Sequence, residues 1–92
     1  MSGVNLVEAN LAGAKLQEVN LHGADLSGLD MAQVNLNGAD LSEANLSQAQ
    51  LNQAQMYGAN LSRANLTDAN LNQTKLTGAD LSQTNLNAPQ EQ

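Results

Sequence analysis

The apolar side chains of this chain follow a period of five residues. Leucine or methionine occupies every fifth position from Met1 to Leu86, and a small or branched residue stands two positions before each of them. From residue 4 to residue 84 this second series holds eleven Ala, three Val, two Thr and one Leu. The other positions are mostly polar, so a core built from two residues in every five is expected.

A period of five fits neither a continuous helix nor a continuous strand. On an α-helix five residues advance about 140°, so the leucines would spread around the axis and form no stripe. In a strand, residues two apart share a face, but the next leucine, an odd number of residues on, would point to the opposite face. The chain must therefore bend once in every five residues, and short extended steps joined by corners predict a β-solenoid.

The corner position of the repeat is marked by glycine. All seven glycines lie two residues after a leucine position, where a corner benefits from a residue that tolerates unusual φ and ψ. Glu, Gln, Asp and Arg fill the same position in other units. We therefore expect only some of the corners to require a positive φ.

The recurring unit Ala-(Asp/Asn)-Leu-x-x, as in residues 24–28 and 64–68, resembles the pentapeptide-repeat family. The resemblance covers about residues 1–88 and leaves 89–92 as a polar C-terminal tail. It implies an all-β fold, a right-handed quadrilateral β-helix with four pentapeptides per coil and about four and a half coils. Residues twenty apart would then stack about 4.8 Å from one another, in a rod roughly 20 Å tall.

The twenty-residue coil sorts the leucine positions into four columns, each with its own outer face. We name them the Leu11, Leu16, Leu21 and Leu26 columns; the last also contains Leu6 and Leu86. Glu43 and Arg63 then lie one coil apart and are expected to pair as an exposed ion pair. Thr74 and Thr84 fall on interior positions, so each hydroxyl needs a partner, for which a backbone carbonyl is expected.

The composition restricts the classes of function. The net charge is −6, from nine acidic residues against Lys15, Arg63 and Lys75, which argues against direct nucleic-acid binding. The absence of cysteine excludes disulfides and thiolate metal sites. No apolar run is long enough to span a membrane and no leader precedes the repeat, so a soluble, cytoplasmic protein without a membrane partner is expected.

Candidate chemistry is sparse. His22, the only histidine, lies at an outward position between Ser2 and Ser42 of the neighbouring coils and is interpreted as a solvated surface residue. Tyr57, the only aromatic residue, also points outward and could anchor a partner. Asp40 and Glu43 share a face, but nothing concave or apolar surrounds them. We therefore predict no catalytic residues, no metal ligands and no cofactor-binding residues, and the chain is not expected to be an enzyme.

Two functions are consistent with such a rod. The first is a non-catalytic structural scaffold or protein-interaction module, with a protein partner that the sequence does not identify. The alternative follows from the resemblance, since some members of the family are acidic mimics of DNA that inhibit DNA gyrase and confer quinolone resistance. Mimicry needs acids gathered on one side, and two adjacent faces hold most of them. The Leu26 column has Glu8, Asp25 and Asp68, and the Leu21 column has Asp40, Glu43 and Asp80 against Arg63.

The two ends of the predicted solenoid lack evident caps. The repeat begins at Met1 without a cap, and after Leu86 only Pro89 and a short polar tail follow. Uncovered coils would present unpaired backbone and leucine side chains, so end-to-end association into a homo-oligomer is expected. Two alternatives stay open: the chain is a segment of a longer solenoid, or it completes the stack of another chain.

Overall fold

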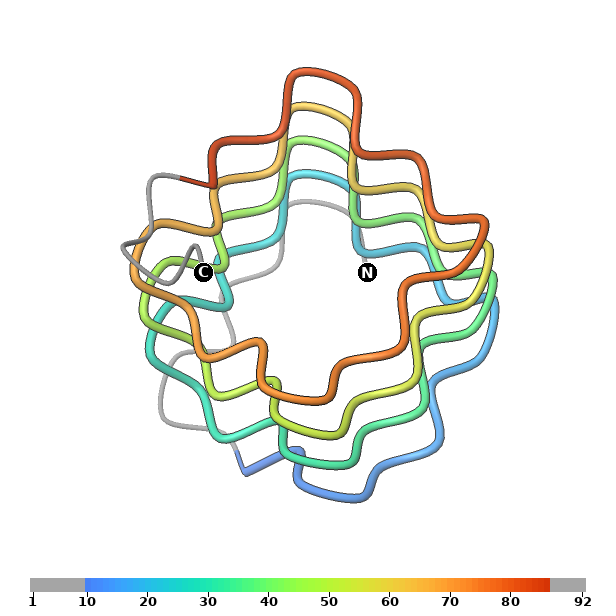
Figure 1. Ribbon diagram of the computed structural model, residues 1–92, viewed down its shortest axis with the longest axis vertical. Helices are drawn as coiled ribbons and strands as arrows, with labels where there is room; N and C mark the ends of the chain where they lie inside the picture. Colours follow the sequence, from blue (N-terminus) through green and yellow to red (C-terminus); the bar gives the residue numbers. More distant parts are fainter. Residues whose placement is uncertain (1–9, 87–92) are drawn as a thin grey trace.

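The backbone winds into a stack of coils, and each coil takes twenty residues (Figure 1). The computed structural model describes residues 10–86. Isolated parallel bridges join each residue before a leucine position to the residue twenty further on, from Asn10 with Asp30 to Asn65 with Asn85. The extents of the molecule are 32 × 23 × 19 Å, and Figure 1 looks down the shortest of them, along the coil. The predicted β-solenoid with four pentapeptides to each coil is therefore present, at about the predicted height.

Each of the predicted short extended steps is a single bridged residue. Among residues 10–86 there is no helix and no strand of several residues; single bridged residues at 10, 15, 20 and so on to 85 alternate with two-residue turns. Each unit has only five residues, and the turn takes two of them, so nothing longer than one bridge fits on a side. No helix in this part of the chain is long and apolar enough to cross a membrane. Met1, Leu6, Glu8 and the predicted tail 89–92 lie outside the described residues.

Backbone hydrogen bonds run in both directions along the stack, as the unit 41–45 shows. The N–H groups of Leu41 and Glu43 donate to carbonyl oxygens of the following coil, at 2.7 and 2.9 Å. The N–H of Asn45 donates to the carbonyl of Ala24 in the preceding coil at 2.8 Å, and the N–H of Ala44 closes the turn on the carbonyl of Leu41 at 3.0 Å. Every central unit thus gives two donors to one neighbouring coil and one donor to the other.

The core consists of the leucine or methionine positions and the small positions that precede them, as predicted. Leu21, Met31 and Leu46 are fully inaccessible to solvent, and Leu29, which replaces the usual alanine, is 2% exposed. Complete burial of each large side chain contributes roughly 1.5–3 kcal/mol, so stability accumulates by repetition of one contact. No polar side chain among the described residues is buried.

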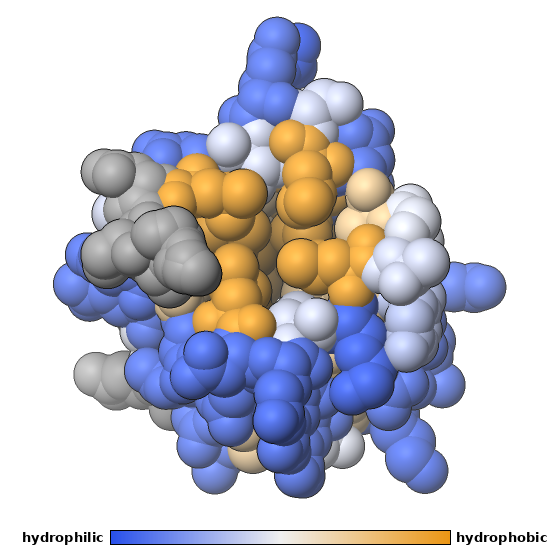
Figure 2. Space-filling view, in the orientation of Figure 1, coloured by the Kyte–Doolittle hydropathy of each residue, from blue (hydrophilic) through white to orange (hydrophobic). Residues whose placement is uncertain are grey.

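Burial is incomplete toward both ends of the described stack. Leu11 and Leu16 are only partly buried at one end, and at the other end Leu81 and Leu86 are 37% and 43% exposed. Figure 2 shows apolar side chains gathered at the centre of the C-terminal end, surrounded by hydrophilic ones.

The two interior threonines are satisfied as expected. The Thr74 hydroxyl donates to the carbonyl oxygen of Leu51 at 2.8 Å, and the Thr84 hydroxyl donates to that of Leu61 at 2.7 Å. Both bonds cross one coil, and both carbonyls also accept the N–H that closes their own turn. A hydroxyl is therefore tolerated inside because a turn carbonyl has a second lone pair to offer.

The expectation that only some corners need a positive φ was wrong. All fifteen corner residues between 10 and 86 have φ between 56 and 77°, and nine of them are not glycine. The same hydrogen bond closes the turn whichever residue stands there, because a turn with positive φ at its third residue has the type II geometry. The non-glycine corners are Glu18, Gln33, Glu43, Gln48, Gln53, Arg63, Asp68, Gln73 and Gln83. The uniform path of the coil imposes the conformation, at roughly 1 kcal/mol for each such side chain.

Exchanging glycine and non-glycine corners tests this constraint. Gly28 has φ +71° with open space around an added Cβ, so Gly28→Ala is expected to lower the free energy of unfolding through the backbone alone, by about 0.5–1 kcal/mol. Gln48→Gly, at φ 61°, is expected to raise it by a similar amount. Thermal unfolding measures both, since about 1 kcal/mol shifts Tm by about 4–8 °C in a domain of this size. Gln48→Ala is the control and should change little. Full stability of Gly28→Ala would contradict the constraint.

Candidate interaction surface

In most described units the residue before the leucine position completes the backbone hydrogen bonding. In each central unit, the residue directly after the leucine, such as Ser42 after Leu41, is the only one whose N–H donates neither to a neighbouring coil nor to the turn carbonyl. The Oδ1 atom of an Asp or Asn accepts this N–H at 3.0–3.2 Å, a short-range bond typical of these side chains. It does so for Asn10, Asn20, Asp25, Asp30, Asn35, Asp40, Asn45, Asn60, Asn65, Asn70 and Asp80. This role was not predicted from the sequence, although the Asp/Asn preference in the repeat was its signal.

Four described units lack this cap, and one of them finds another acceptor; the residues before their leucine positions are Lys15, Gln50, Gln55 and Lys75. Gln55 stands where Asp or Asn is usual, and its longer side chain does not accept the N–H of Tyr57. Instead Asn37 of the preceding coil accepts that N–H with its Oδ1 atom at 2.8 Å and donates from Nδ2 to Gln55 Oε1 at 3.4 Å. The Tyr57 N–H is therefore satisfied by a side chain of the preceding coil.

Hydroxyl side chains strengthen several of these caps. Ser42 Oγ donates to Asp40 Oδ1 at 2.6 Å, and Ser82 Oγ donates to Asp80 Oδ1 at 2.6 Å. The hydroxyl first, and the backbone N–H of the same serine second, lower the pKa of Asp40 and of Asp80 below the ordinary value of 3.8. These carboxylates are held as hydrogen-bond acceptors, which is unlike the raised pKa of a general acid.

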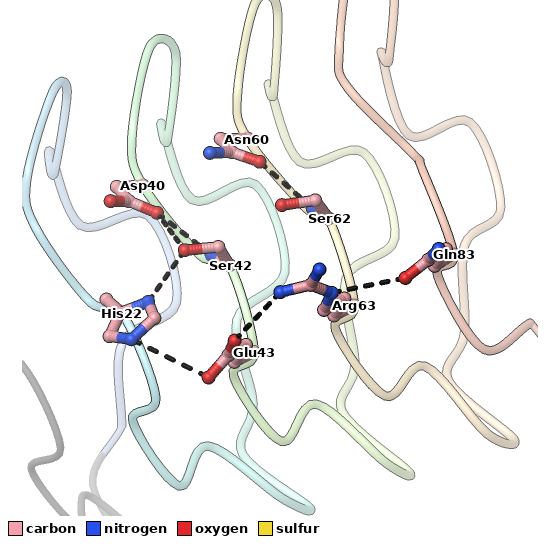
Figure 3. Close-up of polar contacts among 8 residues, drawn as sticks. All are labelled: His22, Asp40, Ser42, Glu43, Asn60, Ser62, Arg63 and Gln83. Atoms are coloured by element: carbon pink, nitrogen blue, oxygen red, sulfur yellow. Dashed lines mark hydrogen bonds and ion pairs between the residues drawn. The ribbon is translucent and has the colours of Figure 1, made fainter.

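Polar side chains of four successive coils are connected on the outside of the Leu21 column (Figure 3). His22 Nδ1 lies 2.7 Å from Ser42 Oγ, and His22 Nε2 lies 3.7 Å from Glu43 Oε1. Arg63 continues the line: its Nη1 lies 3.4 Å from Glu43 Oε2, and its Nε donates to Gln83 Oε1 at 3.1 Å. We call the set His22, Asp40, Ser42, Glu43, Arg63 and Gln83 the Leu21 network.

The Leu21 network contains two residue groups about which the sequence made predictions, the Glu43–Arg63 pair and His22. The predicted ion pair of Glu43 with Arg63 is confirmed, and because both side chains are about half exposed or more, it is worth only about 0–1 kcal/mol. His22 points outward as expected, with 44% of its side chain exposed, but it contacts Ser42 and Glu43 rather than being solvated alone.

The neighbouring serine, histidine and carboxylates do not form a nucleophile site. The Ser42 hydroxyl donates its hydrogen bond to Asp40 Oδ1. In the contact with His22 its oxygen is therefore the acceptor, and His22 Nδ1 carries the hydrogen. A serine nucleophile would need the opposite polarity, with the imidazole nitrogen accepting the hydroxyl proton. No pocket was found over residues 10–86, and no group of three potential metal-ligating side chains occurs within that range.

The other faces carry less connected features. On the Leu11 column Gln33 Nε2 donates to Gln53 Oε1 at 2.8 Å, and Gln53 Nε2 donates to Gln73 Oε1 at 3.0 Å. On the Leu16 column Tyr57 is 42% exposed, as the sequence predicted. Neither face joins charged and polar side chains across four coils as the Leu21 network does.

The lowered pKa of Asp40 predicts that the free energy of unfolding falls at acid pH. A depressed folded pKa contributes stability above the unfolded pKa of about 3.9, and that contribution is lost as pH falls through the folded value. Asp40→Asn keeps an acceptor for Ser42, as Asn60 does for Ser62, but it does not titrate. We expect the wild type to lose more unfolding free energy than Asp40→Asn between neutral pH and about pH 2.5 in denaturant titrations. Equal losses, or a carboxyl NMR titration of Asp40 at or above 3.8, would contradict the assignment.

Comparison with known proteins gives this repeat its family. A family model described as pentapeptide repeats matches residues 1–31, 30–68 and 64–88, with eight copies. The crystal structure of alr5209, a pentapeptide repeat protein from Nostoc Pcc 7120, aligns with a TM-score of 0.80 at 44% identity. That alignment covers 82% of this chain and 62% of alr5209, so the chain spans less than two thirds of that relative.

A second cyanobacterial structure is more distant. HetL, a pentapeptide repeat protein involved in heterocyst differentiation regulation from Nostoc sp. Strain PCC 7120, aligns with a TM-score of 0.46 at 34% identity, over 94% of this chain and 46% of HetL. No curated protein matches the chain. The family model alone accounts for nearly all of the sequence, and the chain belongs to the pentapeptide-repeat family.

Proposed function

We propose that this protein is a non-catalytic interaction module that presents the Leu21 network to a protein partner. We take the repeat as a right-handed quadrilateral β-helix of about four and a half coils, and these coils hold that face in place. The observation that carries the proposal is the continuity of the network, because side chains from four coils are already fixed against one another before any partner binds.

Preorganisation is what makes this face suited to binding. Ordering a long side chain at an interface costs about 0.5–1.5 kcal/mol, and a side chain that is already held avoids part of that cost. Arg63 is restrained from both sides, by Glu43 and by Gln83, while its side chain stays 64% exposed. It can therefore still donate to a partner, and arginine is enriched at the sites that dominate protein interfaces.

The chemistry of the face supports binding rather than catalysis. The hydroxyls and backbone N–H groups of Ser42 and Ser82 are engaged in caps, in which the carboxylates of Asp40 and Asp80 act as acceptors. The face lies on the outside of a convex coil, whereas enzymes gather their reacting groups in a concavity. The pentapeptide-repeat family is likewise one of structural repeat proteins without catalytic activity.

Partner capture with matched variants tests the proposed face. Arg63→Gln and Lys75→Gln each remove one positive charge from an exposed side chain, but only Arg63 belongs to the Leu21 network. Immobilised wild type and Lys75→Gln are expected to retain the same protein from an extract of the native host. Arg63→Gln should weaken its binding at least about tenfold in a titration with that purified protein, the loss expected for about 1.4 kcal/mol. Equal binding by the two variants would show that the Leu21 network is not the binding face.

The alternative function, DNA mimicry directed at DNA gyrase, rests on the acidic charge. The net charge is −6, and Asp25, Asp40, Asp68 and Asp80 lie on the two adjacent faces named from the sequence. The Leu21 network reduces this support, because Glu43 is paired with Arg63 and lies near His22. The face therefore has a mixed character rather than the uniform negative charge of a phosphate backbone.

A supercoiling assay with purified gyrase distinguishes the two functions. A mimic of DNA should inhibit supercoiling at low micromolar protein, and the inhibition should weaken as salt rises, since it depends on exposed charges. The interaction module should leave gyrase activity unchanged at the same concentrations. Inhibition that is abolished by Asp25→Asn with Asp68→Asn, but not by Arg63→Gln, would favour the mimic.

A further inference from the structure

Asn37 and Gly38 form the only Asn-Gly pair among the thirteen asparagines of this chain. An asparagine side chain can be attacked by the backbone nitrogen of the following residue, and a glycine there hinders the attack least because it has no Cβ. Nine of the other twelve asparagines precede leucine, whose side chain obstructs that approach. Asn37 is therefore the asparagine whose sequence context most favours deamidation, the loss of the side-chain amide as ammonia.

Deamidation requires no cofactor and consumes only water. The Gly38 nitrogen gives up its proton and bonds to Asn37 Cγ, the bond from Cγ to Nδ2 breaks, and Nδ2 takes up a proton and leaves as ammonia. Water then opens the five-membered imide ring. If the bond from Cγ to the Gly38 nitrogen breaks, the product is aspartate. If the bond from the main-chain carbonyl carbon to that nitrogen breaks, the product is isoaspartate, and the main chain then runs through the former side chain.

In the folded coil the reacting groups are held by the unit that lies one coil further on. The Gly38 N–H donates to the carbonyl oxygen of Tyr57 at 2.9 Å. Asn37 Oδ1 accepts the N–H of Tyr57 at 2.8 Å, and Asn37 Nδ2 donates to Gln55 Oε1 at 3.4 Å. The attacking nitrogen, the amide oxygen and the leaving nitrogen are therefore each engaged by a separate partner.

Glu18 adds a restraint at the same place, from the preceding coil. A Cβ built on Gly38 would lie 3.1 Å from Glu18 Cγ and 3.9 Å from Glu18 Oε2, so the Glu18 side chain lies over Gly38. A nearby carboxylate disfavours the loss of the Gly38 amide proton, because that loss would create a second negative charge. The first step of the reaction is therefore opposed by charge as well as by hydrogen bonds.

The hold on Asn37 depends on the exceptional residue before Met56. In most described units an Asp or Asn at that position accepts the N–H that Tyr57 here donates to Asn37. Because Gln55 leaves that N–H unpaired, the Asn37 side chain is recruited across the coils. We propose that Asn37 is a latent deamidation site, which its contacts with Gln55 and Tyr57 keep unreacted while the coil is closed. The inference does not depend on the Leu21 network, since Asn37 lies on the Leu16 column.

Deamidation would weaken the coil in which it occurs. An aspartate at position 37 keeps an acceptor for the Tyr57 N–H, but its carboxylate has no hydrogen to donate to Gln55 and adds a negative charge near Glu18. Isoaspartate adds a backbone atom to the turn that the Ala39 N–H closes on the Leu36 carbonyl at 3.0 Å. The altered unit no longer matches the coils on either side, so one opening that allows the reaction makes later openings easier.

Incubation of the full chain at mildly alkaline pH tests the site. Mass spectrometry of proteolytic fragments follows the replacement of each side-chain amide by a carboxyl group, in buffer and in denaturing urea. In urea Asn37 is expected to react faster than every other asparagine. In buffer, below the onset of thermal unfolding, it should react at least about tenfold more slowly than in urea, because the reaction requires a local opening of the coil. Equal rates in the two conditions, or a faster reaction at another asparagine in urea, overturn the proposal.

Two matched variants test the hold itself. Gln55→Asn restores the usual cap for the Tyr57 N–H and so removes both partners of the Asn37 side chain. Gln50→Asn makes the same change on the Leu11 column, where its contact is with Asn70. In buffer Gln55→Asn should react at position 37 at least about fivefold faster than the wild type, the effect of losing two ordinary hydrogen bonds. Gln50→Asn should match the wild type.

An unchanged rate at position 37 in Gln55→Asn overturns the proposal, and so does an equal acceleration in Gln50→Asn. Thermal unfolding checks that neither variant is less stable than the wild type, as expected for a change to the residue that most other units carry. If one of them is less stable, the wild-type rates in buffer and in urea decide the matter.

Discussion

The constraint on which this structure depends is that a unit of only five residues must satisfy its backbone N–H groups through the adjacent coils, its own turn and its own side chains. Three donors reach adjacent coils, one closes the turn, and the fifth is left over. In most of the described units an Asp or Asn before the leucine accepts that fifth N–H, so the sequence preference outside the core has as firm a physical reason as the leucine inside it. The core gives the coil its stability, and the caps let so short a unit close without an orphan donor.

Much of the fold followed from the sequence because the repeat is periodic and the core is simple. A period of five excluded helix and strand, and the twenty-residue coil placed Glu43 beside Arg63 correctly. It also placed the hydroxyls of Thr74 and Thr84 inside, with carbonyl partners. Each of these depends only on which positions stack, and stacking is fixed by spacing alone.

The features that were missed depend on backbone conformation and side-chain reach. Residue preferences at Gln48 or Arg63 favour negative φ, but the closed path of the coil overrides them at every corner. The contacts of His22 with Ser42 and Glu43 need rotamer geometry that column membership does not provide. The bond from the Tyr57 N–H to Asn37 could not be anticipated either, since it replaces a cap that Gln55 fails to make.

The core and the surface of this solenoid repeat with different periods. The interior repeats every five residues, so removing one unit, such as residues 46–50, would leave a leucine beneath every leucine. The outer contacts repeat every twenty, and the same removal would place every later side chain one face away from its former neighbours. Arg63 would then stand over Gly38 instead of Glu43, and the Leu21 network would no longer exist. Insertion or deletion of a whole coil keeps both patterns. Insertion or deletion of a single unit keeps the fold but changes which side chains are neighbours on the surface.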